Sequence, residues 1–112
     1  MKPLLPSLRE KKRYLAFEII SNKKVNKMPY EEIQKSMLGL HGSIGLADAG
    51  LIFLKNKWNT ELQRGIIKVS HRSVDDLKGA LCFVDQINNT ESSIRSVGVS
   101  GILKKAEEKY LQ

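Results

Sequence analysis

The chain lacks most of what a disulfide-bonded or membrane-spanning protein needs. It has one cysteine in 112 residues, Cys82, so an internal disulfide is excluded. No apolar run approaches the roughly 20 residues that a membrane-spanning helix requires. The first residues also lack the long apolar region of a signal peptide. We therefore expect a cytoplasmic protein with no membrane partner. Cys82 falls in an apolar helical segment, which predicts a buried, packed thiol.

Catalytic and metal-binding patterns are missing as well. Neither His41 nor His71 has a cysteine or an acidic pair nearby at the spacing of zinc ligands. The chain contains no nucleophile elbow and no P-loop. Its adjacent acidic pairs, 75–76 and 107–108, would point about 100° apart on a helix, which is typical of solvated or capping charges. We predict no catalytic residues, no metal site and no cofactor in the protein itself.

Positive charge, in contrast, is abundant and unevenly spread. The net charge is +7, from 19 Lys and Arg against 12 Asp and Glu. Residues 1–27 hold eight basic and two acidic side chains, and all the others hold 11 basic and ten acidic ones. Such asymmetry favours a polyanionic partner, with a solvated lysine-rich surface as the alternative. Residues 1–12, which contain two prolines, are predicted to form a basic arm before a single domain over residues 13–112.

Alternating apolar residues predict the strands. Residues 13–20 and 62–70 alternate clearly. Residues 92–100 also alternate, with Val97 and Val99 expected on one face. The apolar segment over residues 45–54 ends in a run that we interpret as a strand buried on both sides. A polar turn separates this run from the strand at 62–70, so the two strands should form a hairpin.

Helical spacing predicts three helices. The first, over residues 29–42, has proline at its start and glycine at its end. The second, over residues 73–88, starts with an approximate capping box at Ser73. The third follows residues 98–101, where glycine permits a sharp turn and Ser100 is the expected N-cap.

This order of elements predicts an α+β, ferredoxin-like fold, which RNA-recognition domains share. It implies a β-α-β-β-α-β sandwich with a four-stranded antiparallel sheet, both helices on one face, and an extra C-terminal helix. Ile20 and Ile66 on the other face indicate that the C-terminal helix or a protein partner covers it. RNA-recognition domains stack bases on aromatic residues of two strands, but here only Tyr14 of the first strand is available. We therefore expect phosphate contacts rather than base stacking.

Four segments, read together, resemble ribonuclease P protein component 2 of archaea, the family that includes the eukaryotic Pop-five and Rpp-fourteen subunits. The similarity runs from about residue 6 to residue 106, and its most specific part is Arg95 to Lys105. The segments are Leu8-Arg9-Glu10-Lys11-Lys12-Arg13-Tyr14, residues 45–50, Gln63-Arg64-Gly65-Ile66-Ile67-Lys68-Val69-Ser70-His71 and residues 94–106. The loop at 55–61 and the tail after Ala106 match no pattern.

The resemblance implies a non-catalytic, RNA-binding subunit of the ribonucleoprotein that removes 5′ leaders from precursor tRNA. In that enzyme the RNA is the catalyst, and Mg²⁺ is expected at the partner RNA rather than on the protein. The implied partners are ribonuclease P RNA and a TIM-barrel-type protein subunit. Homodimerisation within the complex is a further expectation.

Charge, expected exposure and position in the matching segments together predict nine RNA-binding cations. Replacing three of the N-terminal ones is expected to weaken RNA binding and flatten its salt dependence. The nine are Lys11, Lys12, Arg13, Arg64, Lys68, Arg72, Arg95, Lys104 and Lys105.

Two other interpretations stay open at this point. Residues 42–45 follow a helix, as the backbone-clamping loop of a KH domain does, although the apolar run behind them favours a strand. A ferredoxin-like domain can also serve as a small-molecule regulatory or dimerisation module. The basic N-terminal quarter has no role in that alternative.

Overall fold

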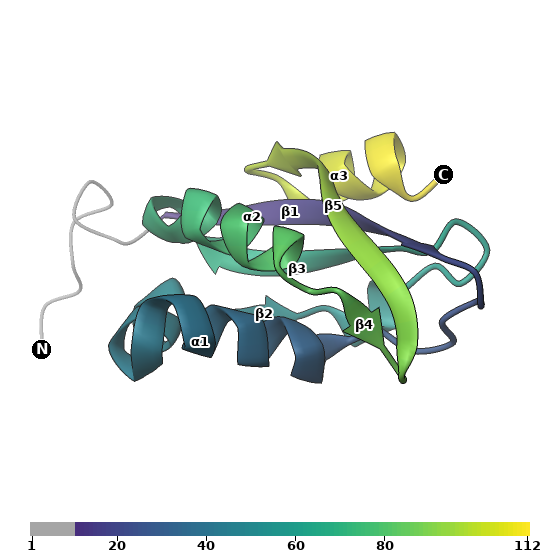
Figure 1. Ribbon diagram of the computed structural model, residues 1–112. Coiled ribbons are helices and arrows are strands. Elements are labelled where there is room, and N and C mark those ends of the chain that lie inside the picture. The colour runs from purple at the N-terminus through teal and green to yellow at the C-terminus, as the bar shows by residue number, and fades with distance from the viewer. Residues whose placement is uncertain (1–10) are drawn as a thin grey trace, which may run out of the picture.

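Five antiparallel strands form one sheet, in the order β2-β3-β1-β5-β4 (Figure 1). The computed structural model describes residues 11–112, so the predicted basic arm, apart from Lys11 and Lys12, lies outside the described residues. In chain order the elements are β1 (Lys12–Ser21), α1 (Tyr30–Ala49), β2 (Ile52–Phe53), the 3-10 turn η2 (Lys55–Lys57), β3 (Arg64–Ser70), the 3-10 turn η3 (His71–Ser73), α2 (Val74–Cys82), β4 (Gln86–Ile87), β5 (Thr90–Ser100) and α3 (Leu103–Tyr110). The α+β prediction is confirmed, but the sheet has five strands rather than four, because β4 adds a short strand beside β5.

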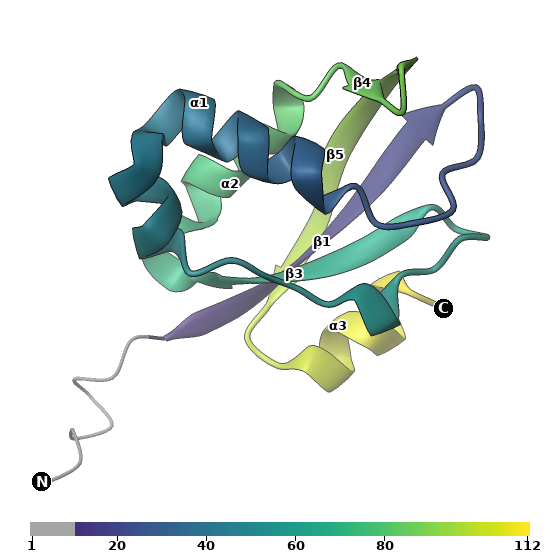
Figure 2. The same cartoon turned by 90° about the horizontal axis from the view of Figure 1, so that it is seen from below.

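The sheet is covered on both faces. Figure 2 shows α1 and α2 on one side of it and α3 on the other. The larger core, beneath α1 and α2, contains Leu15 and Phe17 of β1. On the opposite face, Ala16 and Ile66 are fully buried against Ala106 of α3. The C-terminal helix therefore covers the outer face, which was one of the two predicted covers, the other being a protein partner. Ile20 on that face stays 54% exposed.

The segment before β2 differs from the prediction. Gly42, with φ 73°, interrupts α1, but the chain then resumes the helix as far as Ala49. Gly50 ends it in the left-handed conformation, which glycine adopts without steric cost. Consequently β2 has only two residues, and Ile52 is 49% exposed. The expectation of a strand buried on both sides was wrong, because β2 is an edge strand that pairs only with β3.

The second helix is also shorter than predicted. It ends at Cys82, and Ser73 makes no side-chain cap hydrogen bond, since a 3-10 turn precedes the helix. Cys82 is exposed, so the prediction of a buried thiol was wrong. The physical reason is its position one residue after Leu81, about 100° around the helix from the buried stripe.

A bulge in β5 breaks the predicted alternation of its valines. Ala16 pairs with Gly98 whereas Phe17 pairs with Ser96, so Val97 is the extra residue. Val97 packs on the α3 side of the sheet, and Val99 packs against the larger core. Further on, Ile102 occupies the N-cap position of α3, and the hydroxyl of Ser100 accepts a hydrogen bond of 3.1 Å from its N–H. Ser100 thus stabilises the turn before the helix instead of capping the helix.

Gly98 allows α3 to approach the sheet closely, and it is not needed to turn the chain. Its φ is not positive, but an added Cβ would collide with the Tyr110 ring of α3. The absence of a side chain at this position therefore lets α3 lie directly on the sheet.

We predict that Gly98→Ala destabilises the fold by about 1–3 kcal/mol, because the methyl group would overpack the contact between β5 and α3. Urea unfolding monitored by circular dichroism measures the change. In the Tyr110→Ala background, Gly98→Ala should lower the unfolding free energy by less than it does in the natural chain, and a double-mutant cycle measures this difference. Strict additivity of the two substitutions would contradict this account.

Candidate nucleic-acid interface

Cationic side chains gather where β1 begins and β3 ends. Lys12 pairs with Ser70 across the two strands, and the N–H of His71 donates a 2.9 Å hydrogen bond to the carbonyl of Lys11. The first residues of β1 are thereby fixed beside the turn that carries Arg72. We call this group the basic end, and its members are Lys11, Lys12, Arg13, Lys68 and Arg72.

The first turn of α3 lies next to this group. β5 ends at Ser100, which pairs with Tyr14 of β1, and Gly101 sits beside the Arg13 guanidinium. The exposed side chains of Lys104 and Lys105 follow within the next four residues. The structure therefore brings seven of the nine predicted cations to one side of the molecule.

These cations differ in how freely they face solvent. Lys11 and Arg72 are exposed, whereas Arg13 and Lys68 are partly buried. Arg13 donates a 3.1 Å hydrogen bond to the carbonyl of Lys12, and the Lys68 ammonium lies 5.9 Å from the Tyr14 ring centroid. The Tyr14 ring itself packs into the cluster under α3 and is partly buried. The arrangement presents charge rather than an open aromatic platform, which suits phosphate contacts.

The remaining two predicted cations lie elsewhere. Arg64 is at the start of β3, roughly 20 Å from Ser70 at its end, given about 3.4 Å per residue. Arg64 Nε lies 2.9 Å from one carboxylate oxygen of Glu18, and Arg95 Nη2 lies 2.7 Å from the other. Arg64 also donates a 3.1 Å hydrogen bond to the Tyr110 carbonyl, which ties the end of α3 to the sheet. These contacts give both arginines a structural role, while the Arg95 side chain stays 62% exposed.

Glu18 is held as a carboxylate by this arrangement. Burial of the side chain, which is 18% exposed, would by itself raise the pKa. Hydrogen bonds and charge from Arg64 and Arg95 outweigh that effect, so the pKa of Glu18 is lowered from its ordinary value of 4.5. The ion-paired carboxylate therefore stabilises the folded chain above the unfolded-state pKa.

We expect this stabilisation to disappear as the pH falls through the folded-state pKa of Glu18, which lies below 4.5. The difference in unfolding free energy between the natural chain and Glu18→Gln should be largest above about pH 5 and shrink towards about pH 3. Urea titrations at several pH values measure it. Glu108→Gln, which removes an exposed carboxylate from α3, is the matched control. A Glu18→Gln difference that does not change with pH would contradict this assignment.

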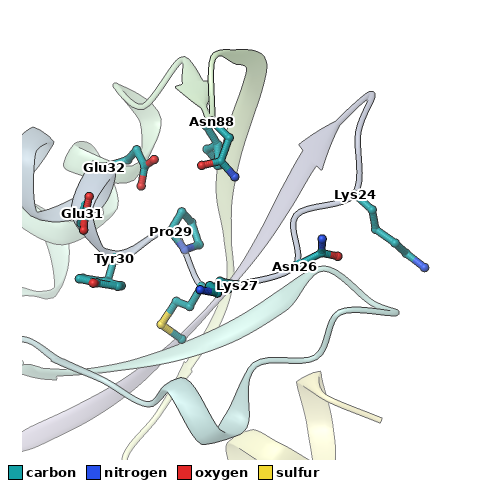
Figure 3. A pocket seen from close by; sticks show the side chains of 10 residues that line it. Lys24, Asn26, Lys27, Pro29, Tyr30, Glu31, Glu32 and Asn88 are labelled. Carbon is teal, nitrogen blue, oxygen red and sulfur yellow. The ribbon is translucent and has the colours of Figure 1, made fainter.

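Two surfaces were not assigned from the sequence. The loop between β1 and α1 carries three more lysines and borders a pocket of about 410 Å³ (Figure 3). On the helical layer, Leu40 and Phe83 line one shallow groove, and Leu38 and Leu46 line its neighbour. Phe83 is 69% exposed, just beyond the end of α2. Phe83 lies outside the helical spacing that Leu77, Leu81 and Val84 share, and this was the available sequence signal.

Within residues 11–112, no three His, Cys, Asp or Glu side chains are grouped closely enough to hold a metal ion. In the same part of the chain, no helix is both long and apolar enough to cross a membrane.

Fold and surface together define an α+β protein whose sheet is covered on both faces and which carries seven of the nine predicted cations on one side, a form suited to a polyanionic partner. The chain matches the model of the Rpp14/Pop5 family over residues 13–111 and belongs to that family.

Relatives match over the whole chain. It is 39% identical to ribonuclease P protein component 2 of Methanosarcina mazei, over 100% of this chain and 94% of the relative. It is 37% identical to the protein of that name from Pyrococcus furiosus, and the match covers 98% of this chain and 91% of the relative. A chain in the cryo-EM structure of yeast ribonuclease MRP shares the fold, with a TM-score of 0.61, 13% identity, and coverage of 83% of this chain and 76% of that one.

These matches bear on the alternatives left open by the sequence. A helical segment does follow Gly42, as a KH domain would require, but the family match assigns the chain elsewhere. The small-molecule regulatory or dimerisation module receives no support from the comparisons.

Proposed function

We propose that this chain is a non-catalytic, RNA-binding protein subunit of ribonuclease P. The RNA would carry the reaction that removes 5′ leaders from precursor tRNA, with Mg²⁺ held at that RNA and no cofactor on the protein. The observation that carries the proposal is membership of the Rpp14/Pop5 family, together with archaeal relatives named ribonuclease P protein component 2 that match along the full chain. We also infer a cytoplasmic location and a ferredoxin-like core formed by β2, β3, β1 and β5.

The basic end, with Lys104 and Lys105, is our proposed contact with RNA phosphates. Both lysines stand in the first turn of α3, where unpaired backbone N–H groups add positive potential. No acidic residue occupies that turn to offset the charge. A phosphate would therefore be attracted by the helix terminus and by both side chains at once. Arg64 and Arg95 contribute less in this proposal, because Glu18 already neutralises part of their charge.

We expect Lys11→Ala combined with Arg72→Ala to weaken binding to ribonuclease P RNA and to flatten its salt dependence. Each lost phosphate contact should lower the slope of log K against log salt by about 0.7–0.9. Filter binding across a range of KCl concentrations measures both effects. Lys35→Ala with Lys78→Ala removes the same charge from the helical layer and is the matched control. Equal slopes for the two double variants would remove the basic end from the RNA interface.

A protein partner is the second part of the proposal. We place a TIM-barrel-type subunit against the groove that contains Leu40 and Phe83, because exposed apolar side chains on a small protein favour protein contacts. Self-association of two copies of this chain through the same groove is the competing arrangement. The second copy and the TIM-barrel-type subunit could not occupy the groove at the same time.

The direct test is cleavage of precursor tRNA by ribonuclease P RNA at moderate magnesium, with and without the protein and its TIM-barrel-type partner. We expect the pair to stimulate cleavage and neither protein to do so alone. Phe83→Asp should abolish stimulation without unfolding the chain, because Phe83 is exposed. If folded protein and active RNA give no stimulation in the presence of the partner, the proposed function is wrong.

A further inference from the structure

The pocket beside the β1–α1 loop is separate from the basic end. It is bounded by that loop, by the first turn of α1 and by the turn between β4 and β5 (Figure 3). It shares no lining residue with the basic end, and its inner wall lies over the middle of the sheet, where Tyr30 packs against Phe53, the partner of Ile67 in β3. The pocket's volume of about 410 Å³ falls within the range of small-ligand sites.

The loop that forms one wall is held in place by specific contacts. The side chain of Gln63 accepts a 2.8 Å hydrogen bond from the N–H of Val25 and donates one of 2.9 Å to its carbonyl. Val25 and Met28 are each only 4% exposed. The backbone between them is therefore anchored at both ends before any ligand arrives, which lowers the entropic cost of binding.

The other walls are equally supported. Asn88 adopts a left-handed conformation, φ 54°, in the turn after Ile87, which is 2% exposed. Tyr30, at the start of α1, packs against Phe53 with ring centroids 6.1 Å apart. Polar groups that line the pocket are thus carried by fixed segments rather than by a loose loop.

The lining combines three kinds of group in a consistent arrangement. In the view of Figure 3, Glu32 of α1 and Asn88 of the turn between β4 and β5 both lie above Pro29. The apolar surface of the pocket comes from Pro29, Met28 and Ile87. Lys27 supplies positive charge on the loop side, whereas Lys24 points away from the pocket and its ammonium lies 3.2 Å from the Glu61 carboxylate (Figure 3).

This set of groups matches a guanine nucleotide. The Watson–Crick edge of guanine presents two adjacent donors, N1–H and the 2-amino group, which a carboxylate can accept together. Its O6 is an acceptor for a side-chain amide donor, and its ring faces suit an apolar surface. Adenine, cytosine and uracil do not present two adjacent donors on that edge. Lys27 would meet the attached phosphate.

We propose that this pocket binds one unstacked guanine of a single-stranded RNA segment, with Glu32 accepting from its Watson–Crick edge and Lys27 contacting the phosphate. The inference rests on the proposed function for RNA as the source of the nucleotide. It gives the protein two separate RNA contacts: phosphates would bind at the basic end, and one base would be recognised in the pocket.

The test compares the trinucleotides UGU and UAU by fluorescence anisotropy with the full chain. UGU should bind on the order of tenfold more tightly, the discrimination expected of one bidentate base contact. Glu32→Gln should reduce UGU binding to the level of UAU. Asp48→Asn, the same charge change at an exposed site on α1, should leave the preference intact. Lys27→Ala should weaken both trinucleotides alike and keep the preference.

Each other outcome is decisive. Equal affinity for UGU and UAU, or a preference that survives Glu32→Gln, would overturn the guanine pocket. If GMP binds as tightly as UGU, the ligand is a free nucleotide and the assignment to RNA is wrong. A failed pocket with intact stimulation of precursor tRNA cleavage would leave the proposed function standing. A retained guanine preference without stimulation would overturn the proposed function instead.

Discussion

Burial of β1 on both faces is the constraint on which the rest of this structure depends. Leu15 and Phe17 pack beneath α1 and α2, while Ala16 between them packs beneath α3, and all three are fully buried. A central strand covered on both sides needs a helix that approaches closely from each direction. Small residues permit this on the α3 side, where Ala16 and Gly98 are paired neighbours.

Once α3 lies on the sheet, its position determines how the protein can meet RNA. The face on which RNA-recognition domains stack bases is here occupied by the helix. Hydrogen bonds hold the C-terminal end of α3 on the sheet. Arg64 donates both to the Glu18 carboxylate and to the Tyr110 carbonyl. The Asn59 side chain donates to the Leu111 carbonyl. The surfaces left for a polyanion are the ends of the sheet, and the cations gather there.

The two ends of the sheet offer different chemistry. At the basic end the side chains are cationic and the nearby aromatic ring, Tyr14, is engaged in packing. At the other end the lysines accompany a pocket lined by carboxylates and amides. A subunit that supports a folded RNA needs affinity for the RNA backbone and a way to select the nucleotides at which it binds. The basic end would supply the affinity, and the pocket would supply the selection.

The sequence by itself determined the α+β class, the alternating strands β1 and β3, the need for a cover on the outer face, and the family. Alternation and helical spacing are local patterns, and the resemblance is read directly from residue order. Tertiary structure alone decided that Arg64 and Arg95 meet at Glu18, from 46 and 77 residues away, and that Val97 and Val99 face opposite sides. It also decided the exposure of Cys82 and the assembly of the pocket from three separated segments. These features depend on strand register, on one bulge and on where helices stop. Such choices are set by packing between distant residues, which no local pattern encodes.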